Sequence, residues 1–90
     1  MVFLPLATMK TGDFRESLTL ALSRKYGKSE AFAIATTFIA HHLNLIPSQV
    51  SQQATTELSD ELMATLNSGK ELLLQGVPVQ YVLETAWFLD

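Results

Sequence analysis

The sequence predicts an all-α fold, a small bundle of four to five helices with the start of a β segment at its C-terminus. Two observations predict it. Apolar residues recur at helical spacing along most of the chain, and the four Gly and three Pro fall mainly between these periodic segments. With 90 residues and 48% hydrophobic composition, the chain suits one small domain with a modest core. We assign residues 1–84 to this helical domain and residues 85–90 to the start of a β linker.

The first helix is expected between Gly12 and the dipeptide Tyr26-Gly27. Arg24 and Lys25 lie in its last turn, where cations interact favourably with the helix dipole. One stripe of its surface is apolar and consists of Phe14, Leu18, Ala21 and Leu22.

The second helix is expected to have Ser29 as its N-cap and to stop before Pro47, because proline disfavours the α conformation of the residue before it. A helix that is apolar over so much of its circumference is typical of the centre of a bundle. Its two adjacent apolar stripes are Ala31, Ala35, Phe38, His42 and Leu45, and Phe32, Ile39, Leu43 and Ile46.

A short helical turn at residues 47–52 and a polar connection at residues 53–57 precede the third helix. Ser59 is the expected N-cap of that helix, and Gly76 has the position of the glycine that commonly ends one. Gly69 lies inside the helix, where it indicates either close helix packing or a weak point.

Pro78 suits the first position of a short fourth helix. Residues 85–89, TAWFL, have the β-branched and aromatic content of a strand, which is why the β segment is expected there. Trp87 and Phe88 are large adjacent aromatic residues. We expect them either to pack on the bundle or to contact a further segment or partner.

Few residues suit catalysis or metal binding. His41 and His42 are adjacent, so on a helix their side chains point about 100° apart and do not converge on one metal. Asp60 and Glu61 lie in a first helical turn, where carboxylates complement the helix dipole. The chain has no Cys, no GxSxG elbow, no GxGxxG and no P-loop. We therefore expect no catalytic, cofactor-binding or metal-binding residue in it.

Charge is distributed unevenly along the chain, whose net charge is −3. Residues 1–28 contain five basic and two acidic residues, whereas residues 29–90 contain one basic and seven acidic residues. The net charge argues against direct nucleic-acid binding, and the basic cluster of Arg24, Lys25 and Lys28 suits a protein partner. No apolar run approaches the roughly 20 residues of a membrane-spanning helix, so we expect a cytoplasmic protein that does not bind a membrane.

Residues 75–88, QGVPVQYVLETAWF, resemble a sequence signature of the PrmC/HemK family, the peptide-chain release factor glutamine N5-methyltransferases. In that family, the motif Gly-x-Pro-x-Gln-Tyr closes an N-terminal helical domain and leads through a short β segment into the catalytic domain. Pro78, Gln80 and Tyr81 match the motif, whereas Glu84 stands where the family usually has Gly. Upstream helices are similar too, so the resemblance covers roughly residues 13–88.

The resemblance implies a role within a larger enzyme. Such enzymes transfer a methyl group from S-adenosylmethionine to the glutamine of the Gly-Gly-Gln motif in class I release factors, the proteins of translation termination. The family's catalytic Asn-Pro-Pro-Tyr motif and glycine-rich cofactor loop belong to the methyltransferase domain, and neither is present here. This chain is then expected to be a non-catalytic domain that helps to hold the release factor against that domain. The interdomain junction would contain Pro78, Gln80, Tyr81, Trp87 and Phe88, and the partner-binding residues would be Arg24, Lys25 and Lys28.

Two other functions remain compatible with the sequence. A stand-alone helical adaptor would bind a protein partner without an attached methyltransferase, and would fold Trp87 and Phe88 onto its own bundle. A small enzyme would use His41 or His42 and would need a pocket with converging polar groups, which no motif indicates. An Asn-Pro-Pro-Tyr motif encoded downstream of Asp90 would distinguish the methyltransferase from the adaptor.

Overall fold

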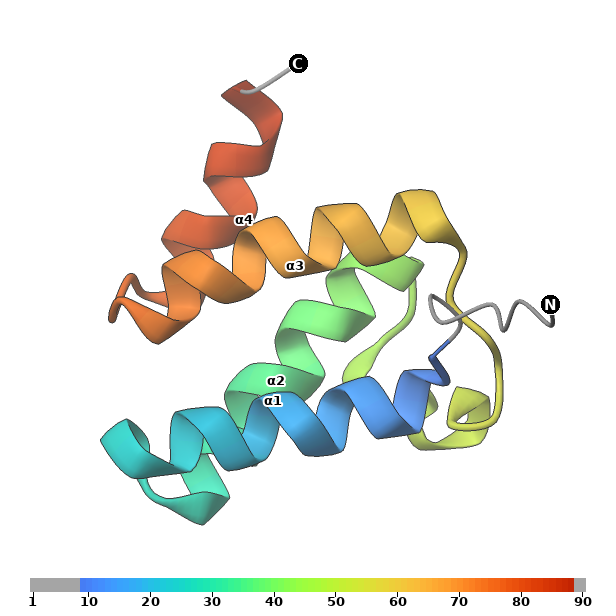
Figure 1. Cartoon of the computed structure of the whole chain (residues 1–90), viewed down its shortest axis with the longest axis horizontal. Coiled ribbons are helices and arrows are strands. Elements are labelled where there is room, and N and C mark those ends of the chain that lie inside the picture. The colour runs from blue at the N-terminus through green and yellow to red at the C-terminus, as the bar shows by residue number, and fades with distance from the viewer. Residues whose placement is uncertain (1–8, 89–90) are drawn as a thin grey trace, which may run out of the picture.

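Four α-helices and two short 3-10 turns form the structure, a computed structural model that describes the backbone of residues 9–88 and the side chains of residues 9–84 (Figure 1). The helices are α1 (Thr11–Tyr26), α2 (Lys28–Leu43), α3 (Asp60–Leu74) and α4 (Val79–Phe88), and the turns are η1 (Pro47–Gln49) and η2 (Ser51–Gln53). The described part of the chain contains no strand. The predicted all-α bundle is confirmed.

α1 begins without a side-chain cap, and a connection distant in the sequence satisfies its first amides instead. Thr11 and Gly12 donate their backbone N–H groups to the carbonyl oxygens of Thr56 and Ala54, each over 2.9 Å. A Cβ on Gly12 would lie 3.0 Å from the Cβ of Ala54, so this close approach favours glycine. The segment after η2 therefore holds the start of α1.

α1 and α2 run in opposite directions and are joined at Gly27, whose φ is +84° (Figure 1). The prediction that Ser29 caps α2 is wrong. Gly27 occupies the N-cap position, its carbonyl accepts the N–H of Ala31 at 3.0 Å, and Ser29 lies within the first turn of the helix. The reason is the turn itself, because a glycine with positive φ reverses the chain within a single residue and lets α2 begin at Lys28.

α2 ends at Leu43 and not immediately before Pro47. Asn44 adopts the left-handed conformation, with a φ of +62°, and its N–H bonds to a carbonyl of the last turn. Leu45 donates its N–H to the carbonyl of Ala40 over 2.8 Å, which closes the helix by a Schellman-type pattern. The asparagine thus ends the helix before the proline can.

Both predicted ends of α3 are confirmed. The Ser59 hydroxyl oxygen accepts the N–H of Leu62 over 3.1 Å and so caps the N-terminus. Gly76 has a φ of +97° and donates its N–H to the carbonyl of Leu73 over 3.0 Å. Val77 donates its N–H to the carbonyl of Leu72, the residue before Leu73, which completes a second Schellman pattern.

α4 corrects the expectation for the C-terminal end. The helix continues to Phe88, so the predicted β segment is wrong for residues 85–88, while residues 89–90 lie outside the described residues. A helix satisfies its backbone groups within one segment, whereas a strand needs a partner, so the strand propensity of this stretch does not decide its structure. Pro78 precedes the helix by one position, and its carbonyl accepts the N–H of Val82 over 3.1 Å.

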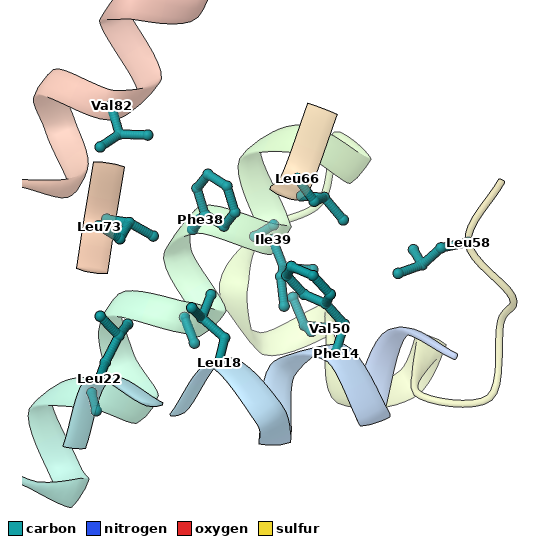
Figure 2. Close-up of a cluster of buried hydrophobic side chains, with 13 residues drawn as sticks. Phe14, Leu18, Leu22, Phe38, Ile39, Val50, Leu58, Leu66, Leu73 and Val82 are labelled. Carbon is teal, nitrogen blue, oxygen red and sulfur yellow. The ribbon is translucent and has the colours of Figure 1, made fainter. Parts of the chain in front are cut away.

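The core lies where α1, α2 and α3 meet, and Val82 extends it to α4 (Figure 2). α2 contacts each of the other three helices and has more buried residues than α1 or α3, so its predicted central position is confirmed. The largest fully buried apolar side chains are Phe38, Leu18, Leu22, Ile39, Leu66, Leu73 and Val50.

One predicted stripe of α2 is only partly buried. Ile39 has no exposed surface, but Phe32 and Ile46 at either end of the stripe are 48% and 60% exposed. The other helices cover the face that carries Ala35 and Phe38, and this leaves the side of Phe32 accessible. Phe32 is therefore a surface residue and not a core residue.

Candidate functional site

The α1–α2 turn and the α3–α4 turn lie at the same end of the bundle (Figure 1), and residues next to both turns line one groove. The side-chain nitrogen of Lys25 is 3.4 Å from the position that a Cβ on Gly76 would occupy. We define residues 24–28 and 75–81 together as the turn end. A groove of about 330 Å³ lies between the two turns, and its lining residues are Tyr26, Glu30, Ile34, Leu73, Val77, Pro78, Val79 and Gln80.

The residues that match the junction motif lie at the start of α4, on the surface of the turn end. Pro78, Gln80 and Tyr81 are all exposed, and Tyr81 exposes 63% of its surface. The next residue, Val82, is 3% exposed and anchors the helix in the core. With Glu84, the three motif residues line a depression of about 250 Å³. The three motif residues thus lie at the surface, next to the buried Val82.

Two further features of the motif concern α4 beyond its first turn. Glu84 lies within the helix and has no positive φ, since Asn44 is the only residue other than glycine with a positive φ in the described part of the chain. The backbone at Glu84 consequently does not require the glycine that the family usually has. Trp87 and Phe88 belong to the end of α4, and their side chains lie outside the described residues.

The predicted partner-binding cations surround the α1–α2 turn. Arg24, Lys25 and Lys28 are exposed, and none of them forms an ion pair within residues 9–84. Arg24 and Lys25 also line a second groove, of about 400 Å³, whose other lining residues are Ala21, Leu22 and Leu74. The fold thus brings these cations to the same end of the molecule as the junction residues, although the two sets are distant in the sequence.

Sequence reasoning missed the α1–α2 side of the groove between the turns. Tyr26, Glu30 and Ile34 line this groove opposite residues of the α3–α4 turn. These three become neighbours of the junction motif only through tertiary contact. Local periodicity therefore carries no signal for them, apart from the helix end that Tyr26-Gly27 marks.

The histidines lie at the opposite end of α2. The His41 and His42 ring centroids are 5.4 Å apart, and the edge-on ring of Phe38 is 4.9 Å from that of His42. Burial, and secondarily the neighbouring His41, lower the pKa of His42 below 6.5, so the fold favours its neutral form. Asp60 and Glu61 are exposed in the first turn of α3. In the described part of the chain, no three His, Asp or Glu side chains form a group suited to a metal ion.

α1 and α2, with 16 residues each, are the longest helices described. A transmembrane helix needs about 20 mostly apolar residues, and none of the described helices reaches the length and apolarity that crossing a bilayer requires.

No protein-family model, no curated protein and no solved structure matches the chain.

Proposed function

We propose that the chain is the non-catalytic N-terminal domain of a PrmC/HemK-type methyltransferase and that it recognises a class I peptide-chain release factor. One observation supports this most. Pro78, Gln80 and Tyr81, which match the junction motif of the family, are exposed at the turn end beside Arg24 and Lys25, which form no ion pair with any described residue. Exposed aromatic and amide groups next to unpaired cations are typical of a surface that contacts another protein or domain.

The domain contributes to the reaction by proximity. Methylation requires the amide nitrogen of the substrate glutamine to be held against the methyl donor. A domain that binds a remote part of the release factor uses that binding energy to orient the reacting amide. S-adenosylmethionine binding and methyl transfer belong to another domain of the same cytoplasmic protein, and no residue of this chain takes part in the chemistry.

The two halves of the turn end have different roles. Pro78 and Tyr81 lie at the start of the helix that leads to the catalytic domain, and they contact that domain together with Gln80. Arg24 and Lys25, with Lys28, contact the release factor, because unpaired surface cations attract and orient an acidic partner.

A titration of the ¹⁵N-labelled chain with an unlabelled class I release factor tests this recognition. We expect the amide signals of the turn end to shift or to lose intensity first. The double charge reversal Arg24→Glu with Lys25→Glu should weaken binding about tenfold or more. The matched reversal Lys10→Glu with Lys70→Glu changes charge by the same amount away from the turn end and should leave Kd unchanged. A spectrum that does not change at several hundred micromolar release factor would contradict recognition by this domain.

The coding sequence downstream of Asp90 separates this function from a stand-alone helical adaptor. We expect an Asn-Pro-Pro-Tyr motif in the same reading frame, and methylation of the release-factor glutamine by the protein encoded there. Release-factor binding by a protein whose gene ends without this motif would favour the adaptor instead.

A further inference from the structure

A separate groove follows the seam between α1 and α2. Its volume is about 390 Å³, and it shares only Lys28 with the residues of the turn end. We call it the seam groove. Its lining residues are Gly12, Arg15, Glu16, Thr19, Leu20, Lys28 and Phe32.

Large apolar side chains are exposed in the seam groove. Leu20 and Phe32 are 58% and 48% exposed, although the other large apolar residues of both helices are buried or partly buried against the core. Among the described residues, only Ile46 and Tyr81 are comparable exposed apolar residues, and neither lines this groove. Adjacent exposed apolar side chains commonly mark a surface that contacts a protein.

Arg15 is held over the aromatic ring in this groove. Its guanidinium carbon lies 4.7 Å from the centroid of the Phe32 ring, and its Nη2 donates to the hydroxyl of Ser51 over 3.2 Å. No carboxylate from residues 9–84 pairs with this guanidinium, so other N–H donors remain available to a ligand. Lys28 has no ion pair within the same residues. Two unpaired cations thus accompany an apolar surface.

We propose that the seam groove binds a protein segment in which carboxylates flank a large apolar side chain. The apolar side chain packs on Leu20 and Phe32, and the carboxylates pair with Arg15 and Lys28. The pre-positioned guanidinium suits a bidentate bond to a carboxylate. This inference rests on the proposed function and adds to it the chemistry of the release-factor segment that the domain recognises.

Single-stranded RNA fits the groove less well than an acidic protein segment. Grooves that bind single strands combine cations with aromatic faces on which bases stack. Here the guanidinium of Arg15 covers one face of the Phe32 ring, so a base cannot stack on that face.

A synthetic peptide, Asp-Glu-Leu-Glu-Asp-Phe-Glu, serves as the probe in a titration of the ¹⁵N-labelled chain. We expect the amides of Leu20 and Phe32 to shift, and we expect the shifts to disappear when the peptide's carboxylates are changed to amides or its apolar residues to Ala. Phe32→Ala and Arg15→Gln should each weaken peptide binding about fivefold or more. The matched variants Ile46→Ala and Lys10→Gln, outside the groove, should leave binding unchanged. Equal weakening by the matched variants would overturn the assignment.

The release factor separates failure of the seam groove from failure of the proposed function. We expect it to shift the amides of Leu20 and Phe32 together with those of the turn end, and we expect the acidic peptide to compete for the first set. Shifts confined to the turn end would overturn the seam groove and leave the proposed function standing. An unchanged spectrum would overturn both. Tighter binding of a uridine heptanucleotide than of the peptide, lost in Arg15→Gln, would overturn the groove as a protein site.

Discussion

The ring of Phe38 in α2 fills the space beside Gly69 of α3 that any side chain would need. A Cβ on Gly69 would lie 2.5 Å from both Cε1 and Cζ of the ring and 3.3 Å from a methyl group of Val82. The ring is fully buried, so it has no free space into which to move. Of the two interpretations of Gly69 from the sequence, close helix packing is confirmed.

Gly69→Ala should therefore destabilise the domain by about 2 kcal/mol, because overpacking a filled core forces side chains and backbone to shift. The loss should occur although alanine favours a helix interior by about 1 kcal/mol over glycine. Urea unfolding followed by circular dichroism measures the difference. Ser68→Ala, at the exposed neighbouring position, is the control and should be neutral or slightly stabilising. A Gly69→Ala variant as stable as the control would show that the ring can move aside.

Thr36→Val should stabilise the domain. The Thr36 hydroxyl is buried in α2 and has no hydrogen-bond partner in the described part of the chain, so it has lost its bonds to water without replacement. Replacement by an isosteric methyl group should raise the free energy of unfolding by about 1 kcal/mol. Thr37→Val at the exposed neighbouring position should change it little, which separates burial from helix propensity. A loss of stability in Thr36→Val would indicate a hydrogen bond to bound water.

Features that depend on a few neighbouring residues were predicted well. The cap at Ser59 and the helix end at Gly76 each involve contacts within a few positions, and both are confirmed. The predictions failed where two local signals compete. Gly27 starts α2 before Ser29 can cap it, and Asn44 ends α2 before Pro47. In both cases the residue with a positive φ set the helix boundary, and the sequence pattern does not predict which residue adopts a positive φ.

The residues of the candidate site could be predicted from the sequence, but the fact that they form one surface could not. A motif match selected Pro78 and Tyr81, and charge selected Arg24 and Lys25. That these residues share one end of the bundle follows from the packing of α3 against α1 and α2, which no local pattern encodes. The exposure of Phe32 was missed for the same reason, because helical periodicity cannot say which of two apolar stripes the neighbouring helices will cover.

Ser59→Ala and Ser29→Ala should differ clearly in stability. The Ser59 hydroxyl accepts a backbone N–H of α3, so its loss should cost about 1 kcal/mol of unfolding free energy. Ser29 makes no capping hydrogen bond and is exposed in the first turn of α2, so alanine there should be nearly neutral. Thermal unfolding of the two variants beside the parent chain measures the contrast. Equal losses would indicate that Ser29 contributes to capping in solution.

The stability of the domain should fall as the pH is lowered through the titration range of His42. Burial beside Phe38, together with His41, lowers the pKa of His42 in the folded chain below its ordinary value of 6.5. Well above pH 6.5 the imidazole is neutral in both states and the shift has no effect on stability. As the pH falls below that value, the unfolded chain binds the proton more readily than the folded chain, so the free energy of unfolding decreases until the folded pKa has been passed.

Urea unfolding at several pH values between neutral and mildly acidic tests this, with His42→Gln as the variant that cannot titrate. The variant should be less dependent on pH than the parent chain over this range, because only the parent loses stability through this imidazole. His41→Gln keeps the His42 imidazole beside Phe38 and removes only the smaller, electrostatic cause of the shift, so it should retain most of the dependence. Identical pH profiles for His42→Gln and the parent chain would contradict the prediction, because they would show that the imidazole titrates alike in the folded and unfolded states.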